Sequence, residues 1–260
     1  MGRYSSAANH FLGRGKLYVD RWDSDGASTG ERYVGNASVW EPQAPEDETQ
    51  EIYDYGEAET PLLDKQTTRR KMSMKATLHE FTIQNLALAL MGDVSALAQG
   101  TGTITDEDAT ARSGCYVKLA YRNVDDVVVE PAAGGSAYTE DEDYAVDAIT
   151  GRIYIMTTAE GGSIADEAEL HVSYSYAADT SQTVLAGMSG TIEGSLRFIG
   201  DPKRGRTFEM EVWHFTLAPE GGIPFISDEY GNITLNFEVL SDSENHPAEK
   251  FYRVIERAAA

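Results

Sequence analysis

The most constraining feature of the sequence is the stretch of residues 69–92, RRKMSMKATLHEFTIQNLALALMG, in which the spacing of the apolar residues changes. The first half alternates, and its apolar side consists of Met72, Met74, Ala76 and Leu78. A period of two is typical of a strand with one buried face. The second half follows helical spacing, with apolar residues at Ile83, Leu86, Ala87 and Leu90. The stretch predicts a strand that leads directly into a short helix packed against a sheet.

Capping signals define both ends of this helix. Thr82 is the expected N-cap, and Phe81 before it can pack onto Leu86 as a hydrophobic staple. Gly92 is expected to end the helix in the left-handed conformation.

Most of the remaining chain also has strand patterns, at residues 16–22, 32–40, 187–199, 206–217 and 232–240. Within residues 206–217 the apolar face changes after Val212, which predicts a β-bulge near that residue. The sequence Asp23-Ser24-Asp25-Gly26 lacks the further ligands of a calcium loop and is interpreted as a hairpin turn.

Residues 101–180 differ in composition from the rest of the chain. They hold sixteen acidic and only four basic residues, and their short strands are separated by glycine-containing turns. We interpret this region as a small all-β domain inserted into a first domain of residues 1–98 and 185–260. The alternative is an elaborated continuation of one sheet.

Length, cysteine content and charge limit the class of protein. A chain of 260 residues with 41% hydrophobic residues can build its cores without disulfides, and it has one cysteine, Cys115, which is expected to be a buried and inert thiol. The chain has no secretory signal pattern and no apolar run that would span a membrane, so we expect a soluble protein folded in a reducing cytoplasm. The net charge of −22 argues against tight binding to nucleic-acid phosphates.

Residues 41–64 form an acidic segment without lysine or arginine, followed by a basic run that includes Lys65, Arg69, Arg70, Lys71 and Lys75. The acidic segment is either a flexible solvated loop or an arm that becomes ordered against another subunit. We favour the arm, with its acids facing the basic run of an adjacent copy, although pairing within one chain would have the same sequence. Lys203, Arg204 and Arg206 occupy a turn between two strands, which is either a plain hairpin tip or a tip that docks on a neighbouring subunit. The predicted inter-subunit contacts are Glu46, Asp47, Glu48, Glu51, Asp54, Arg69, Arg70, Lys71, Lys203, Arg204 and Arg206.

Signals for catalysis or metal binding are weak. Asp141, Asp143 and Asp147 have the oxygen ligands that a cation prefers, but neighbouring strand residues point to opposite faces, so a solvated acidic edge is the favoured interpretation. Glu209 and Glu211 share one strand face at a spacing of about 7 Å, within the range of a hydrolase carboxylate pair. Alternating glutamates are also the ordinary polar side of a strand. We predict no enzyme activity, no cofactor and no bound metal.

Four segments, taken in order, resemble the major tail tube protein of long-tailed bacteriophages. They are GRGKLYVDRW at 13–22, GERYVGNASVW at 30–40, RRKMSMKATLHEFTIQNLALALMGD at 69–93 and RTFEMEVWHFTLAPEGGIPFISDEYGNITLNFEVLSD at 206–242. The resemblance covers residues 1–98 and 185–257, and the order of the segments is more specific than any one of them. Residues 101–180 are not covered.

The resemblance implies a mainly β fold, namely a β-sandwich or barrel-like tail tube domain with one short α-helix, plus the inserted domain on the outer surface. It also implies stacked hexameric rings that form the tail tube of the virion, assembled in the cytoplasm of the host bacterium. The implied partners are other copies of the chain, a tape measure protein in the lumen, tail terminator and distal tail proteins, and double-stranded DNA that passes through without specific binding. No membrane is involved. An acidic lumen would let DNA slide because it offers no cationic contacts.

Two other functions are compatible with the sequence. A carbohydrate-binding β-sandwich module is suggested by fourteen tyrosines and three tryptophans. A β-structured hydrolase would use Glu209 and Glu211 and would lose its activity in Glu209→Gln.

Overall fold

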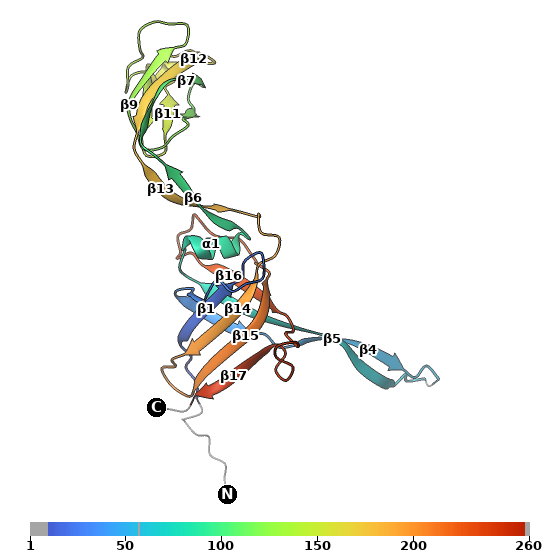
Figure 1. Ribbon diagram of the computed structural model, residues 1–260. Coiled ribbons are helices and arrows are strands. Elements are labelled where there is room, and N and C mark those ends of the chain that lie inside the picture. The colour runs from blue at the N-terminus through green and yellow to red at the C-terminus, as the bar shows by residue number, and fades with distance from the viewer. Residues whose placement is uncertain (1–9, 57, 258–260) are drawn as a thin grey trace. The chain divides into compact units, whose positions relative to one another are not determined.

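The computed structural model describes residues 10–56 and 58–257, and these residues form mainly antiparallel β-structure with one α-helix (Figure 1). The chain divides into two units. Unit 1 comprises Met1–Val94 and Val184–Ala260, and unit 2 comprises Ser95–Thr183. The predicted limits of the insertion, 101 and 180, lie close to the observed ones.

Unit 1 is built on a nine-stranded sheet. Seven strands follow the order β2-β1-β14-β15-β16-β5-β3, while β17 pairs with β15 and β4 pairs with β5. The strands are β1 (Gly15–Arg21), β2 (Arg32–Tyr33), β3 (Ala37–Pro42), β4 (Glu46–Tyr53), β5 (Leu62–Leu78), β14 (Glu193–Gly200), β15 (Thr207–Leu217), β16 (Ile233–Val239) and β17 (Tyr252–Arg257).

The sheet must curl towards closure, because its first and last strands are neighbours in sequence. Only residues 34–36 separate β2 from β3, so the connection spans at most about 14 Å. Seven strands laid flat at about 4.8 Å spacing would put these two strands roughly 29 Å apart. Contact between β1 and β3 is the result of this curvature. Unit 1 is therefore a strongly curved antiparallel sheet with one short helix, within the mainly β fold that the resemblance implied.

The core of unit 1 lies inside this curved sheet. Of the predicted inward residues of β5, Met74, Ala76 and Leu78 are buried and Met72 is half-buried, and the alternate residues of β16 from Ile233 to Val239 are also buried. Phe215 of β15 meets Phe237 of β16 edge-on with 5.0 Å between ring centroids. Helix α1 (Ile83–Ala89) adds Leu88 to the same core. The buried side of β15 changes after Val212, where its register with β14 shifts, so the predicted bulge is confirmed.

The helix begins as predicted but ends differently. Thr82 is the N-cap, and its side chain accepts a hydrogen bond from the backbone N–H of Asn85. At the other end Met91, not Gly92, takes the left-handed conformation, with φ of 49°. Gly92 follows it and donates to the carbonyl of Ala87 at 2.8 Å, which completes a Schellman motif. A glycine is needed at position 92 for another reason, since a Cβ there would lie 2.7 Å from the carbonyl oxygen of Leu185.

Two local predictions concern turns of unit 1. The turn at residues 23–26 forms, because Asp23 Oδ1 accepts hydrogen bonds from the N–H groups of Asp25 and Ala27 and Gly26 has a positive φ. The prediction of one long strand over residues 187–199 is wrong, since β14 begins only at Glu193. Gly187 and Ser189 donate instead to the carbonyls of Leu90 and Met91 at the end of α1.

Unit 2 is a small β-sandwich with its own core. One sheet has the order β7-β12-β9 and the other the order β10-β11-β8. Their strands are β7 (Gly102–Thr110), β8 (Tyr116–Lys118), β9 (Val124–Pro131), β10 (Tyr144–Asp147), β11 (Arg152–Ile155) and β12 (Glu169–Tyr176). Buried residues from both sheets, such as Val129, Ile153 and Val172, form a core separate from that of unit 1. The chain passes between the units along β6 (Asp93–Gln99) and β13 (Asp179–Leu185), which pair with each other.

Cys115 does not occupy the predicted buried position. It lies in an exposed bend just before β8, where its N–H donates to the carbonyl of Arg112. Strand β8 begins only at the next residue, Tyr116, so the thiol stays outside the sandwich.

Candidate assembly interface

The most unusual element of unit 1 is a hairpin that extends beyond its sheet. Strand β5 has seventeen residues, of which residues 72–78 pair with β16 and residues 62–71 pair only with β4. We call β4 together with residues 62–71 of β5 the arm (Figure 1). All ten arm residues of β5 are exposed, as is β4 apart from the half-buried Thr49. Ten strand residues span roughly 33 Å, so the arm is long and has no core of its own.

Opposite charges face each other across the arm. The guanidinium of Arg70 makes two hydrogen bonds to the carboxylate of Asp47, at 2.8 and 2.9 Å, and Lys65 Nζ lies 2.7 Å from Glu51 Oε1. Arg69 lies 3.5 Å from Glu48. The hydrogen bond from Arg70 lowers the pKa of Asp47, and the one from Lys65 lowers the pKa of Glu51. These cross-strand pairs favour one register of a hairpin that has no buried face.

The structure shows the pairing within one chain that the sequence left open. The basic run was expected to face the acidic segment of an adjacent copy, but Arg69, Arg70 and Lys65 contact acids of their own chain. Lys71 lies opposite Glu46 in the register, and its ammonium pairs with Glu238 of β16 at 2.6 Å. Asp54 folds back on the arm tip, where it accepts a hydrogen bond from the N–H of Gly56. Within one chain, most of the acidic segment therefore forms a hairpin strand paired with the basic run.

The second predicted contact region is the turn between β14 and β15. Arg206 forms an ion pair with Glu256 of β17. The backbones of Lys203 and Arg204 bond to Leu12, while both side chains are exposed. In the described part of the chain the turn makes no ion pair with the arm, so the predicted set of contact residues is not brought together within one chain.

Exposed apolar side chains mark two further surfaces of unit 1. One is the tip of the arm, where Tyr55 is 82% exposed and Leu63 is 63% exposed. The other is the connection between β15 and β16, where Ile226 and Tyr230 are almost fully exposed. Sequence reasoning missed both surfaces, because it weighed the charges of these segments and not their few large apolar residues. Large exposed apolar groups of this kind are typical of protein contact sites.

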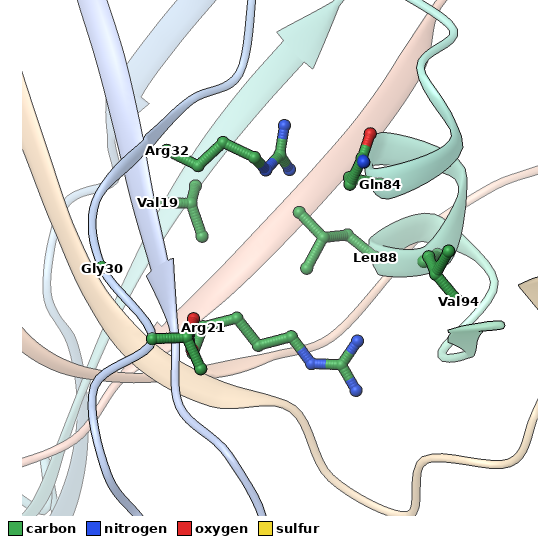
Figure 2. Close-up of a pocket in the computed structure, with 9 residues that line it drawn as sticks. Val19, Arg21, Gly30, Arg32, Gln84, Leu88 and Val94 are labelled. Atoms are coloured by element: carbon green, nitrogen blue, oxygen red, sulfur yellow. Dashed lines mark hydrogen bonds between the residues drawn. The ribbon is translucent and has the colours of Figure 1, made fainter. Parts of the chain in front are cut away.

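A cavity of about 260 Å³ lies between β1, β2 and α1 (Figure 2). Its wall is apolar at Val19, Leu88 and Val94, and two arginines reach its rim. Arg21 is engaged there, since it contacts the carboxylate of Asp93, the hydroxyl of Ser189 and the carbonyl of Gly92. Figure 2 shows Arg32 extending from β2 towards Gln84 of α1.

Glu209 and Glu211, the candidate hydrolase pair, lie on the outer face of the sheet within a network of arginines. Arg197 approaches both carboxylates, at 3.4 and 3.2 Å. Arg257 pairs with Glu209 and Arg253 with Glu211, at 3.3 and 2.6 Å. Each carboxylate thus has two guanidinium partners, which is typical of a structural ion-pair network on a sheet.

The acidic cluster of unit 2 is also bound by protein donors. Asp143 accepts hydrogen bonds from the N–H of Thr139 and from the N–H and hydroxyl of Ser163. Asp147 binds Thr150 and Arg152. Within residues 10–56 and 58–257, no three His, Cys, Asp or Glu side chains are grouped as a metal site would require.

The sequence places this chain in a known family. A family model described as "Protein of unknown function UCP028589" matches residues 10–255. The chain belongs to this family. Both units and the arm lie within the region that the family model matches. No curated protein matches the sequence significantly. Among the described residues, no helix is long and apolar enough to cross a membrane.

Proposed function

We propose that this protein is a structural subunit that assembles with copies of itself into stacked rings, and that these rings form the tail tube of a long-tailed bacteriophage. In this proposal the rings are hexamers, the tube is the conduit for genomic DNA, and the tape measure, terminator and distal tail proteins are its other partners. Unit 2 projects from the outside of the tube. No catalysis is required of any residue.

The arm is the observation that carries this proposal. A lone subunit holds about twenty residues of paired strand in water, without burying an apolar face of that hairpin. Such a segment contributes little to the stability of its own chain, whereas it offers two strand edges and an apolar tip to a neighbour. The order of the tail tube-like segments in the sequence supports the same conclusion independently.

The charge of the chain supports the proposal as well. Proteins bind DNA tightly through lysines and arginines that contact phosphates and release counterions. A net charge of −22 disfavours such contacts. A tube built from such subunits would let a duplex pass. The arginines of the outer sheet face are held by Glu209, Glu211 and Glu31, so they do not offer free cations to phosphate.

A carbohydrate-binding β-sandwich module is the second proposal, and one observation favours it. Tyr116 of unit 2 is 57% exposed and lies 5.2 Å from the ring of Tyr154, with the guanidinium of Arg152 over its face. Exposed ring faces flanked by polar groups suit a sugar. This observation concerns only one face of unit 2. Sugar binding there would not explain the exposed arm of unit 1, so the tail tube proposal comes first.

Negative-stain electron microscopy and light scattering of the purified wild-type chain test the first proposal. We expect rings or tubes of uniform diameter as the concentration is raised. A protein that stays monomeric at high concentration contradicts tail tube assembly. If that monomer also bound glycans, and lost binding in Tyr116→Ala, the carbohydrate-binding proposal would replace it.

A further inference from the structure

The cavity between β1, β2 and α1 has the chemistry of a receptor for an acidic and apolar segment. Arg32 is half-buried at its rim, and no carboxylate of residues 10–56 or 58–257 lies within 4 Å of its guanidinium. Its guanidinium makes a long contact of 3.5 Å to the carbonyl of Tyr33. Burial lowers the pKa of Arg32, yet an arginine remains cationic in proteins. The chain has about twice as many acidic as basic residues. A half-buried arginine that still lacks an acidic partner among the described residues indicates that this partner comes from another molecule.

The size of the cavity limits its occupant. About 260 Å³ is below the roughly 300–1,000 Å³ of typical sites for small-molecule ligands. The apolar wall of Val19, Leu88 and Val94 would contact an apolar side chain, while Arg32 and Gln84 would bind a carboxylate. The cavity therefore suits one or two side chains of a protein segment better than it suits a cofactor.

The arm tip has the complementary chemistry. Tyr55, Leu62 and Leu63 are exposed there, and Asp54, Glu59 and Asp64 lie beside them. These three acids form no ion pair within the described residues, in contrast to Asp47, Glu48 and Glu51 further along the arm. Tyr55 is 82% exposed, so the tip is not seated on its own chain.

We infer that the cavity between β1, β2 and α1 receives the arm tip of a second copy of this chain, with an apolar side chain against Leu88 and an acid of the tip bound to Arg32. This inference rests on the proposed self-assembly and names the surface that the arm engages. It differs from the contact expected from sequence, in which the basic run meets the acidic segment of another copy, because Lys65, Arg69, Arg70 and Lys71 pair with acids of their own chain.

Site-directed disulfide formation between two variants tests the inference. In a Cys115→Ser background, one chain carries Tyr55→Cys and the other carries Gln84→Cys, at the exposed rim of the cavity. After mixing, assembly and mild oxidation, we expect a cross-linked dimer on non-reducing gels, which neither variant forms alone. The matched control pairs Tyr55→Cys with Lys250→Cys, an exposed position that does not line the cavity, and should cross-link at least about tenfold less.

Charge reversal of the receptor gives a second readout. Arg32→Glu in the Gln84→Cys chain should reduce cross-linking about tenfold or more, because it places like charges together. Arg32→Gln should have a smaller effect in the same direction, and an unchanged melting temperature would show that both variants fold. If the wild-type chain forms rings, but the Tyr55–Gln84 pair does not cross-link above control and Arg32→Glu assembles normally, the inference is overturned and the proposed function stands. If the wild-type chain forms no rings, both the proposed tail tube function and this inference are rejected.

Discussion

At the scale of single residues, the carboxylate of Asp143 has the clearest structural role in unit 2. It accepts three hydrogen bonds, from the N–H of Thr139 at 2.9 Å and from the N–H and hydroxyl of Ser163 at 2.9 and 2.7 Å. These bonds lower its pKa, with the Thr139 backbone as the largest cause. Because the pKa is lowered on folding, the stabilisation is complete above the ordinary carboxyl pKa of about 4 and is lost as the pH falls through the lower folded value.

Asp143→Asn should therefore destabilise unit 2 by about 1–3 kcal/mol at pH 7. Both carboxylate oxygens accept hydrogen bonds, and asparagine replaces one of them by an NH₂ group, which cannot accept a hydrogen bond from the N–H or hydroxyl that faces it. The loss should shrink between pH 5 and pH 2, where the wild-type carboxylate is itself protonated. Urea unfolding followed by circular dichroism at several pH values measures both effects. Asp141→Asn is the matched control, since asparagine tolerates the left-handed backbone at that position, where φ is 64°. Equal losses in the two variants would contradict the role of Asp143.

Residue-level predictions from sequence succeeded where one local interaction decides the outcome. Thr82 caps α1 because its hydroxyl reaches the N–H of Asn85, which requires only neighbouring residues. Gly92 was assigned the wrong role, because Met91 accepts the left-handed conformation while position 92 is constrained by Leu185, far away in sequence. Arg32 was missed for the same reason: its importance comes from a cavity that only the folded sheet and helix create.

At the scale of elements, the arm is expected to be dispensable for folding and necessary for assembly. Replacing residues 48–69 by Asn-Gly would join Asp47 to Arg70, which face each other across the hairpin, through a favoured two-residue turn. We expect the melting temperature to change by no more than about 2 °C, because the removed residues bury no core side chain. Rings and tubes should disappear. Light scattering and electron microscopy, combined with thermal melts, check both parts.

A control for arm chemistry keeps its full length. Exchanging the charges by Asp47→Arg with Arg70→Asp preserves the cross-strand pair and should leave assembly intact. Tubes formed by the shortened variant would refute the role of the arm.

The arm also shows why some elements escaped prediction. Strands β5 and β16 were recognisable beyond residue 71 because one face is buried and the apolar residues alternate. The arm and β7 have no such pattern: β7 runs through Asp106, Glu107 and Asp108, and β4 is dominated by acids. The arm hairpin has no buried face, and β7 takes its conformation from pairing with β12, about sixty residues later, so neither leaves an apolar period in the sequence.

At the scale of the whole molecule, two cores within one chain should unfold as two separate cooperative units. Leu235 belongs to the core of unit 1 and Leu170 to that of unit 2, and both are essentially inaccessible to solvent. Leu→Ala at either position should cost about 2–5 kcal/mol, because a cavity remains where the side chain was. Since the two residues share no core, each substitution should lower only its own transition.

The distribution of tryptophan makes this prediction measurable in the intact chain. Trp22, Trp40 and Trp213 are the three tryptophans of the sequence, and all belong to unit 1. Intrinsic tryptophan fluorescence should therefore report the unfolding of unit 1, while circular dichroism reports both units. Leu235→Ala should shift the fluorescence transition to lower urea, whereas Leu170→Ala should leave it in place and shift part of the circular dichroism signal. A single transition that moves equally in both variants would mean that the two units fold as one.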